Sequence, residues 1–313
     1  MKAVKKLLWV AALMSVFFKA EAQQDPQFGL GFLNRVFTNP GDAGNTREGL
    51  FTATAANRLE LVNFDGAPVT NVVGLHGPIT LFGISSGVGI TLYNDMAGAL
   101  RAPGISLTYA YRQPLFDGML GVGVTAGMIT SWYAVTNWRL PDGGSADPAV
   151  PMNETAGMNF DAAIGAYYSS DTWFGGLSCK HLTAPRLGVD RTGSLPRTLY
   201  VNAGYRYAFA ETDWTLMPMA ELVSDFAQTS TLWQATAWYR EKYWGGLGYR
   251  WGRALQFMVG FELFEGVRVT YAYEYMTSQL NRFNGGSHEL VLSYSFSLTI
   301  PPGSQRYKSV RYL

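Results

Sequence analysis

Three adjacent residues, Ser287, His288 and Glu289, carry the side-chain types of a hydrolytic triad. In such a triad a histidine takes the proton of a serine nucleophile and a carboxylate orients the histidine. The surrounding pattern predicts a β-strand, however, and neighbouring side chains of a strand point to opposite faces. Ser287 therefore cannot reach His288 directly, and a hydrolase would need a distant partner. We expect a structural or partner-binding role for His288 and no enzymatic activity.

The sequence also gives little support for a metal site, a phosphate-binding loop or a disulfide bond. His76 and His181 show no metal-ligand spacing with each other or with His288. The glycine runs at 83–89 and 121–123 lack the following helix of a phosphate-binding loop, so we interpret them as close-packed strand positions. The single cysteine cannot form an internal disulfide. We expect no metal site, no cofactor and no catalytic residue.

Isolated charges on the polar face of the predicted strands are more informative. Their signs are balanced, whereas the lining of an ion-selective pore tends to one sign. Guanidinium and carboxylate groups in equal number can pair instead. We therefore expect ion pairs across a lumen or with a plug, with an ion-selective pore as the alternative. The eight residues are Arg112, Asp161, Arg206, Glu221, Arg250, Glu262, Arg268 and Glu274.

The elements that must position these charges follow from an alternation of apolar and polar residues, as in 267–275. Its segments of about 9–12 residues suit tilted transmembrane strands, and aromatic residues gather at their ends. Isolated charges would be costly inside a soluble β-sandwich, the main competing fold. We predict an all-β, transmembrane antiparallel β-barrel over 50–300, with about fourteen strands. They are 50–58, 69–76, 86–94, 101–112, 118–131, 156–169, 172–181, 197–209, 213–223, 229–240, 243–250, 254–264, 267–276 and 286–298.

Composition agrees with this fold class. Of 313 residues, 35 are glycine and 15% are charged, against about 25% charged in soluble proteins. Residues 1–22 have the basic start, apolar run and small-residue end of a cleaved signal peptide, which implies export. Its four lysines and one glutamate, removed from 24 basic and 23 acidic residues, leave a net charge of −2. That charge argues against nucleic-acid binding.

Connection lengths predict the orientation. Long connections at 59–68, 132–155, 182–196 and 277–285 follow odd-numbered strands, and short ones follow even-numbered strands. Outer-membrane barrels have short periplasmic turns and long outer loops, so both termini of the chain should face the periplasm. We expect the loops 132–155 and 182–196 to meet secreted cargo.

Two segments lie outside the predicted wall. Residues 23–49 show no sustained period but several apolar side chains, which predicts a plug or a periplasmic docking segment. Residues 301–313 begin with a Pro-Pro-Gly stop and form a short periplasmic tail, whose residues 304–313 we expect to bind partners. The basic and aromatic residues of the tail are Arg306, Tyr307, Arg311 and Tyr312.

Four groups of residues, in order and spacing, resemble the PorP/SprF family of outer-membrane proteins from type IX secretion and gliding-motility systems. A departure is 271–275, where relatives tend to have a Gly-Tyr-Ser-Tyr-Asp-like strand. The groups are Asp25-Pro26-Gln27-Phe28 with Asn39-Pro40 and Ala43-Gly44; Gly176-Leu177-Ser178 with His181-Leu182 and Pro185; Tyr243-Trp244-Gly245-Gly246-Leu247 with Tyr249-Arg250; and Gly286-Ser287-His288-Glu289-Leu290 with Tyr294-Ser295-Phe296.

The resemblance implies a non-enzymatic protein of the cell outer membrane, embedded in its lipid. It implies binding to periplasmic ring proteins of the PorK/PorN or GldK/GldN type and to a peptidoglycan-binding lipoprotein. It also implies a role in the export or surface retention of cargo proteins. A passive outer-membrane porin is the alternative. Candidate partner-binding or plug residues, besides those of the tail, are Asp25, Pro26, Gln27, Phe28, Asn39, Pro40, His181, His288 and Glu289.

Overall fold

The computed structural model describes residues 25–46, 49–133, 157–187, 193–277 and 284–298. The expected signal peptide, most of the loop 132–155 and the expected tail 301–313 lie outside these residues. Within the described ranges, no helix is long and apolar enough to cross a membrane.

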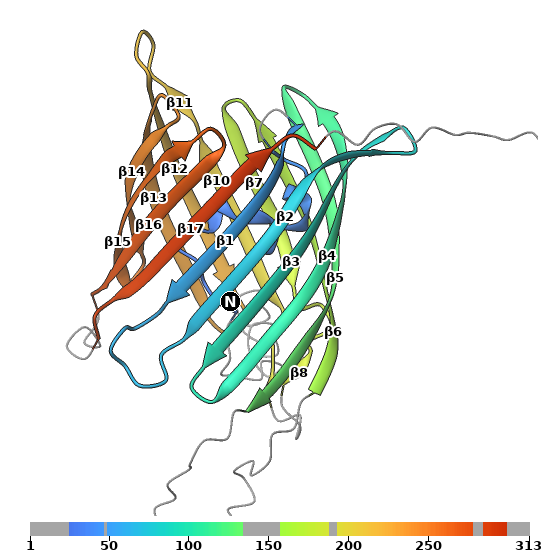
Figure 1. Cartoon of the computed structure of the whole chain (residues 1–313), viewed down its shortest axis with the longest axis vertical. Helices are drawn as coiled ribbons and strands as arrows, with labels where there is room; N and C mark the ends of the chain where they lie inside the picture. Colours follow the sequence, from blue (N-terminus) through green and yellow to red (C-terminus); the bar gives the residue numbers. More distant parts are fainter. Residues whose placement is uncertain (1–24, 47–48, 134–156, 188–192, 278–283, 299–313) are drawn as a thin grey trace, which may run out of the picture.

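The described strands form an antiparallel barrel in which neighbours in sequence are neighbours in the sheet (Figure 1). Pairing of the first strand with the last closes it. β10 and β11 form one strand interrupted at Arg206, and both pair with β12, so the described wall has fourteen strands as predicted. A separate hairpin joins β8 (Arg186–Leu187) to β9 (Gly193–Ser194). The wall consists of β1 (Phe51–Leu59), β2 (Val69–Leu81), β3 (Ile84–Ala97), β4 (Leu100–Leu115), β5 (Gly118–Tyr133), β6 (Gly157–Ser170), β7 (Trp173–Lys180), β10 (Thr198–Tyr205), β11 (Tyr207–Ala208), β12 (Trp214–Ser224), β13 (Thr229–Tyr239), β14 (Tyr243–Arg250), β15 (Ala254–Phe264), β16 (Val267–Met276) and β17 (Ser287–Phe296).

The second and third strands are longer than the ranges 69–76 and 86–94 expected from sequence. β2 continues through Pro78 to a two-residue turn at Phe82-Gly83. Its pairing with β1 ends at His76, so the missing N–H of Pro78 costs no hydrogen bond to that neighbour. The proline therefore interrupts the sequence pattern without interrupting the strand.

The two rims of the barrel differ in their connections. Turns of two to five residues join β2–β3, β4–β5, β6–β7, β11–β12, β13–β14 and β15–β16 at the rim where β1 begins and β17 ends. This rim, uppermost in Figure 1, is the periplasmic one by the usual asymmetry of such barrels. The opposite, outer rim carries the longer connections, although 98–99, 225–228 and 251–253 are short there too.

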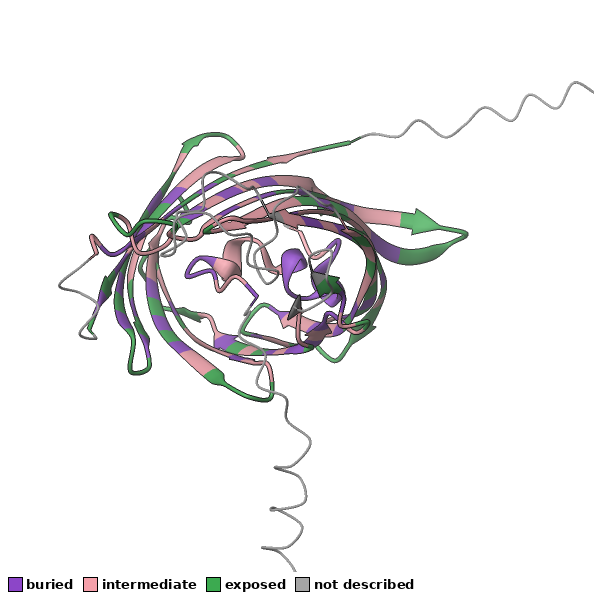
Figure 2. Cartoon of the chain, turned by 90° about the horizontal axis from the view of Figure 1, so that it is seen from below, coloured by how far each residue is buried: buried purple, intermediate pink, exposed green. Residues whose placement is uncertain are grey.

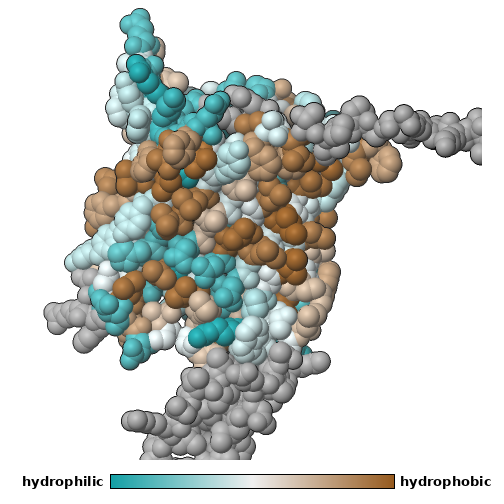
Figure 3. Space-filling view, viewed as in Figure 1, coloured by the Kyte–Doolittle hydropathy of each residue, from teal (hydrophilic) through white to brown (hydrophobic). Residues whose placement is uncertain are grey.

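The outer face of the wall is apolar and the inner face polar. Figure 3 shows apolar side chains over much of one side of the barrel. The alternation is clear in β15, where Leu255, Phe257 and Val259 are exposed while Gln256 and Met258 are buried. An apolar exterior suits lipid, and a polar interior suits a lumen.

Residues 25–46 lie inside the barrel, and we call them the plug (Figure 2). They form three short 3₁₀ turns, η1 (Gly31–Leu33), η2 (Arg35–Phe37) and η3 (Pro40–Asp42). The side chain of Asn39 caps η3 by accepting a hydrogen bond from Gly41 N, and Pro40 occupies the first position of the turn. Apolar side chains of the plug pack against Val72 and Val291 of the wall. Burial of these side chains anchors a segment that has few regular hydrogen bonds of its own.

Candidate functional site

The plug crosses the lumen from the outer side to the periplasmic side. Asp25 contacts His181, which follows the outer end of β7. At the other end of the plug, Gly44 lies against Gly87, near the periplasmic start of β3. The chain then reaches Phe51, where β1 begins at the periplasmic rim. The described chain thus enters the lumen near its outer end.

This path places the predicted N-terminal site residues inside the barrel. Asp25 and Phe28 are each 7% exposed, Asn39 is fully buried, and Pro40 is also buried. Of the two alternatives expected for this segment, a plug or a periplasmic docking segment, residues 25–46 take the position of a plug, and the wall covers these side chains.

Asp25 is held by three side chains of the outer wall. One carboxylate oxygen, Oδ2, lies 2.7 Å from Lys180 Nζ and accepts a 2.5 Å hydrogen bond from the Tyr200 hydroxyl. The other, Oδ1, lies 3.3 Å from His181 Nε2, and the opposite ring nitrogen lies 2.8 Å from Asp161 Oδ2. We call these five residues the Asp25 cluster. It ties the plug to β6, β7 and β10.

The charges within the Asp25 cluster stabilise one another. Burial alone would raise the pKa of Asp25, but Lys180 and His181 together hold it below its usual value. Burial also opposes the protonated form of His181, yet Asp25 and the hydrogen bond with Asp161 raise the pKa of His181 above its usual value. The carboxylate and the imidazolium therefore each favour the charged form of the other.

A second anchor joins the plug backbone to Glu289. Its carboxylate accepts hydrogen bonds from Gly29 N at 2.7 Å and Leu30 N at 2.9 Å. The same carboxylate lies 3.0 Å from Arg58 Nη1, and Arg58 Nη2 lies 2.8 Å from Glu274. Because Arg58, Glu274 and Glu289 are each at most 3% exposed, these are buried, paired charges.

Two further residues extend this arrangement. Arg250 lies 3.0 Å from Glu274 and donates to Gln27 Oε1 of the plug at 3.1 Å. Glu60 lies 2.8 Å from Arg58 Nε. We call Arg58, Glu60, Arg250, Glu274 and Glu289 the Arg58 network. It links β1, β14, β16 and β17 around the outer part of the plug.

The periplasmic part of the plug rests on wall glycines instead. A Cβ atom at Gly87 would collide with the carbonyl of Ala43, one at Gly121 with Gly41, and one at Gly123 with Pro40. We call Gly87, Gly121 and Gly123 the glycine seat. A carbonyl of the plug lies against the backbone at each position, so no side chain fits there. The glycine runs at 83–89 and 121–123 thus contain the sites of closest approach to the plug.

The eight predicted lumen charges take different partners. Arg250 pairs with Glu274, and Arg268 lies 3.2 Å from Glu262 on the adjacent strand. Asp161 contacts His181. These pairs join strands of the same part of the wall rather than opposite walls. Among the described residues, no ion pair within 4.0 Å involves the remaining three, Arg112, Arg206 and Glu221.

Sequence reasoning missed several members of the site. Arg58 and Lys180 lie at predicted strand ends, and their inward direction could have been read from the same alternation. Tyr200 looked like an ordinary aromatic residue of a strand, and nothing local marks it as the hydrogen-bond donor to Asp25. Asp25 and His181 were selected only through the family resemblance, and the structure brings them together.

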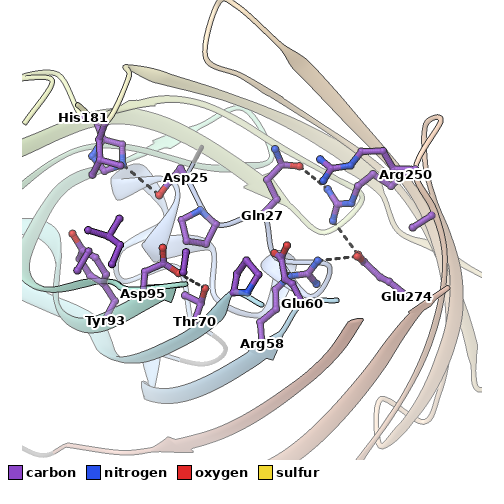
Figure 4. Close-up of a pocket in the computed structure, with 18 of the residues that line it drawn as sticks. Asp25, Gln27, Arg58, Glu60, Thr70, Tyr93, Asp95, His181, Arg250 and Glu274 are labelled. Carbon is purple, nitrogen blue, oxygen red and sulfur yellow. Dashed lines mark hydrogen bonds and ion pairs between the residues drawn. The ribbon is translucent and has the colours of Figure 1, made fainter. Parts of the chain in front are cut away.

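A cavity of about 510 Å³ opens on the outer side of the plug, and we call it the vestibule (Figure 4). Asp25 and His181 lie on one side of it and Arg250 and Glu274 on the other. Its apolar lining comprises chiefly Leu100, Ala102, Ile129, Leu195 and Met276. Asp95 also lines it and accepts a 2.6 Å hydrogen bond from Thr70 Oγ1. Within the described ranges, no cationic group lies within 4.0 Å of the Asp95 carboxylate.

The Ser287-His288-Glu289 segment does not form a triad. Ser287 and Glu289 are buried on the inner face, at 1% and 2% exposure. His288 points to the other face, where Nδ1 lies 2.6 Å from the Tyr271 hydroxyl. In the described part of the chain, no group of three or more His, Cys, Asp or Glu residues is arranged to hold a metal ion.

Solved structures with the same architecture are membrane transport proteins. The toluene transporter TbuX of Ralstonia pickettii matches with a TM-score of 0.51 and 12% identity, over 84% of this chain and 93% of that chain. A deltaS2S3 mutant of the monoaromatic hydrocarbon channel TodX matches with a TM-score of 0.50 and 10% identity, over 84% and 94%. At this identity the likeness shows the fold alone. A search of curated proteins finds no match.

The family comparison covers most of the chain. The model described as "Type IX secretion system membrane protein PorP/SprF" matches residues 20–294, which include the whole plug and nearly all of the wall. The match agrees with the closed barrel and its apolar exterior, which place the protein in the outer membrane. The chain therefore belongs to the PorP/SprF family of type IX secretion system membrane proteins.

Proposed function

We propose that the protein is a non-enzymatic, plugged barrel that serves the type IX secretion machinery as a binding platform in the outer membrane. The observation that carries this proposal is the plug, whose backbone is fixed to the wall by Glu289 and by the glycine seat. A lumen occupied in this way is a poor path for a folded cargo protein. Cargo then passes beside the barrel or is retained on its surface, rather than crossing it.

The two rims are suited to different partners. The periplasmic rim would bind ring proteins of the PorK/PorN or GldK/GldN type and a peptidoglycan-binding lipoprotein, with the tail 301–313 as part of the contact. Its described turns expose both carboxylates and basic groups, such as Asp213 and Arg240. The outer loops 132–155 and 182–196 would meet cargo, and the described part of the second loop exposes Thr183 and Arg186.

Deletion of residues 304–313 tests the periplasmic contact. We expect ring proteins to be lost when the shortened barrel is purified from detergent-solubilised outer membranes by affinity pull-down. A variant with the same ten residues in scrambled order separates sequence recognition from a general effect of charge. Unchanged recovery of the ring proteins by the deletion variant would remove the tail from the proposal.

A passive porin is the second candidate, and the vestibule favours it because it gives the lumen an open outer end. Conductance of the purified protein in planar bilayers separates the two. We expect low conductance from the intact barrel, with larger events only when the plug is destabilised. A large, steady conductance of the intact barrel without partners would instead support the porin.

A further inference from the structure

The vestibule has the size and lining of a small-molecule site. Its volume of about 510 Å³ falls within the range of roughly 300–1,000 Å³ that is typical of ligand pockets. Such pockets combine a mostly apolar lining with a few polar groups that orient the ligand. In the vestibule, Leu100, Ala102 and Ile129 supply an apolar wall from the outer halves of β4 and β5. The plug closes the inner end of the cavity with Pro26 and Gln27.

One carboxylate of this lining, Asp95, has no cationic partner among the described residues. The other three carboxylates of the lining belong to the Asp25 cluster or to the Arg58 network, and each of them contacts a cation. Asp95 is half-buried, and its Oδ1 accepts a hydrogen bond from the neutral hydroxyl of Thr70. None of the described residues donates a hydrogen bond to its Oδ2. A carboxylate in this position is stabilised by a positive group that enters the cavity.

The surroundings of Asp95 suit an ammonium group that carries an apolar body. Alternation along β3 places Tyr93, Asp95 and Ala97 on the inner face of the wall, and all three line the cavity. Figure 4 shows Tyr93 and Asp95 on the same side of the vestibule. An ammonium group can donate to the free oxygen of Asp95, and an adjacent tyrosine ring attracts a cation. The apolar wall then receives the rest of the molecule.

The lining is less suited to an anion. Three of its cationic side chains, Arg58, His181 and Arg250, already contact carboxylates of the protein. The fourth, Arg253, is exposed in the outer connection 251–253. The unsatisfied charge inside the cavity is therefore negative.

We propose that the vestibule binds a small organic cation from the outer side, an ammonium group on an apolar body, with the ammonium group paired with Asp95. Because the plug forms part of the site, through Pro26 and Gln27, the cation binds the plugged barrel in preference to a barrel whose plug has left. The bound cation therefore holds the plug in place.

Binding is tested on the purified barrel by isothermal titration calorimetry in detergent, with empty micelles as the blank. The probe is 2-phenylethylammonium. Its matched control is 2-phenylethanol, which has the same number of heavy atoms and no charge. We expect saturable binding of the cation and about tenfold weaker binding of the alcohol, since the charged group strengthens the hydrogen bond to Asp95. Absence of saturable binding, or equal affinity for the two compounds, would overturn the proposal.

The role of Asp95 is tested by Asp95→Asn, which keeps the shape of the side chain and removes its charge. We expect its affinity for 2-phenylethylammonium to fall about tenfold and its affinity for the alcohol to stay unchanged. Asp65→Asn removes an exposed carboxylate from the outer connection 60–68 and is the matched control. Heat-modifiable gel mobility confirms that each barrel is folded. Unchanged affinity in Asp95→Asn, or an equal loss in both variants, would contradict the ion pair.

The location is tested by filling the cavity. Ala97→Phe adds a ring on the inner face of β3, where Ala97 lines the vestibule, and should abolish binding of both compounds. Met96→Phe adds the same ring on the opposite face of the strand and should leave binding unchanged. Retained binding by a folded Ala97→Phe barrel would place the probe outside the vestibule and overturn the proposal.

Hydrogen exchange tests the link to the plug. At ten times its wild-type dissociation constant, 2-phenylethylammonium should slow exchange of residues 25–30 about tenfold in the wild type. The same concentration should slow it only about twofold in Asp95→Asn, because the weaker site is half occupied. Binding of the cation without slower exchange would contradict a site that includes the plug.

Discussion

The outer and periplasmic parts of the plug are held by opposite kinds of contact. Around residues 25–30 the wall supplies charges, through the Asp25 cluster and the Arg58 network. Around residues 39–44 it supplies chiefly the glycine seat, where wall side chains are missing, and one neutral hydrogen bond, from Gly44 N to His76 Nδ1 at 3.3 Å. The outer contacts depend on charge and protonation, whereas the periplasmic contacts depend on the space left by missing Cβ atoms.

Each part should therefore fail in its own way. Loss of one partner in a buried ion network leaves another charge uncompensated, which costs more than the pair contributed. An added methyl group at the seat forces backbones apart, whatever the pH. The two kinds of variant can be compared directly, because the barrel wall should stay folded in both and only the attachment of the plug should change.

Glu289→Ala should have the largest effect. It removes the acceptor of Gly29 N and Leu30 N and leaves Arg58 short of one carboxylate. We expect the plugged state to lose about 3–5 kcal/mol relative to the released state. Protease cleavage within 25–46 and bilayer conductance should both increase, while the exposed control Glu265→Ala should leave both unchanged. A protected plug in Glu289→Ala would mean that the outer contacts are dispensable.

Gly123→Ala should be the next most damaging change. The new Cβ would collide with the carbonyl of Pro40, and overpacking of this kind costs about 1–3 kcal/mol. Gly245→Ala is a matched control, because its Cβ would meet Met258 O at an ordinary 3.5 Å. We expect higher conductance from Gly123→Ala than from Gly245→Ala. Equal conductance of the two variants would show that the plug does not depend on the seat.

The pH should change protection of the outer part and not that of the seat. Asp25 has a lowered pKa, so its contribution is present above its unfolded value of 3.8 and is lost as the pH falls through the folded value. His181 has a raised pKa, so its contribution is complete below 6.5 and is lost as the pH rises through the folded value. Protection of residues 25–30 in hydrogen exchange should therefore be greatest between about pH 4 and 6.5.

The His181→Asn variant provides the control for this pH dependence. Its alkaline loss of protection should disappear, because the replaced side chain does not titrate. Residues 39–43, which leave out the Gly44 amide bonded to His76, should show little pH dependence in either protein once intrinsic exchange is corrected for. A uniform pH response along the whole plug would contradict the division into two parts.

His288→Ala should have the smallest effect. The imidazole lies on the outer face, where it contacts Tyr271 and Tyr273, and it touches neither part of the plug. We expect unchanged plug protection and a stability change within about 0.5 kcal/mol. Cargo secretion should also be retained. Loss of secretion with an intact plug would reopen the question of chemistry at this histidine.

The sequence predicted the barrel well because the alternating pattern that identifies each strand lies within that strand. Alternation assigns side chains to faces, and connection lengths assign strand ends to rims, both without knowledge of distant residues. This is how Arg250 and Glu274 could be placed in the lumen. The predicted end of the second strand at residue 76 was too early, because a strand tolerates Pro78 only where the neighbouring β1 does not pair with it.

Local sequence patterns could not predict which wall residues contact the plug. Whether Gly123 lies against another strand or against Pro40 depends on how the closed wall and the plug fit together. The bond between Tyr200 and Asp25 likewise joins positions 175 residues apart. Local patterns establish that a residue faces inward, whereas its partner across the lumen follows only from closure of the whole barrel.

The bonds from Gly29 and Leu30 to Glu289 span 260 and 259 positions of the chain. A segment that precedes every strand of the wall is thus fastened by the last strand, β17, which also closes the barrel by pairing with β1. A partly assembled or truncated barrel lacks this fastening, so its interior stays unsealed. A plug docked at Glu289 therefore distinguishes a barrel that contains β17 from one that lacks it.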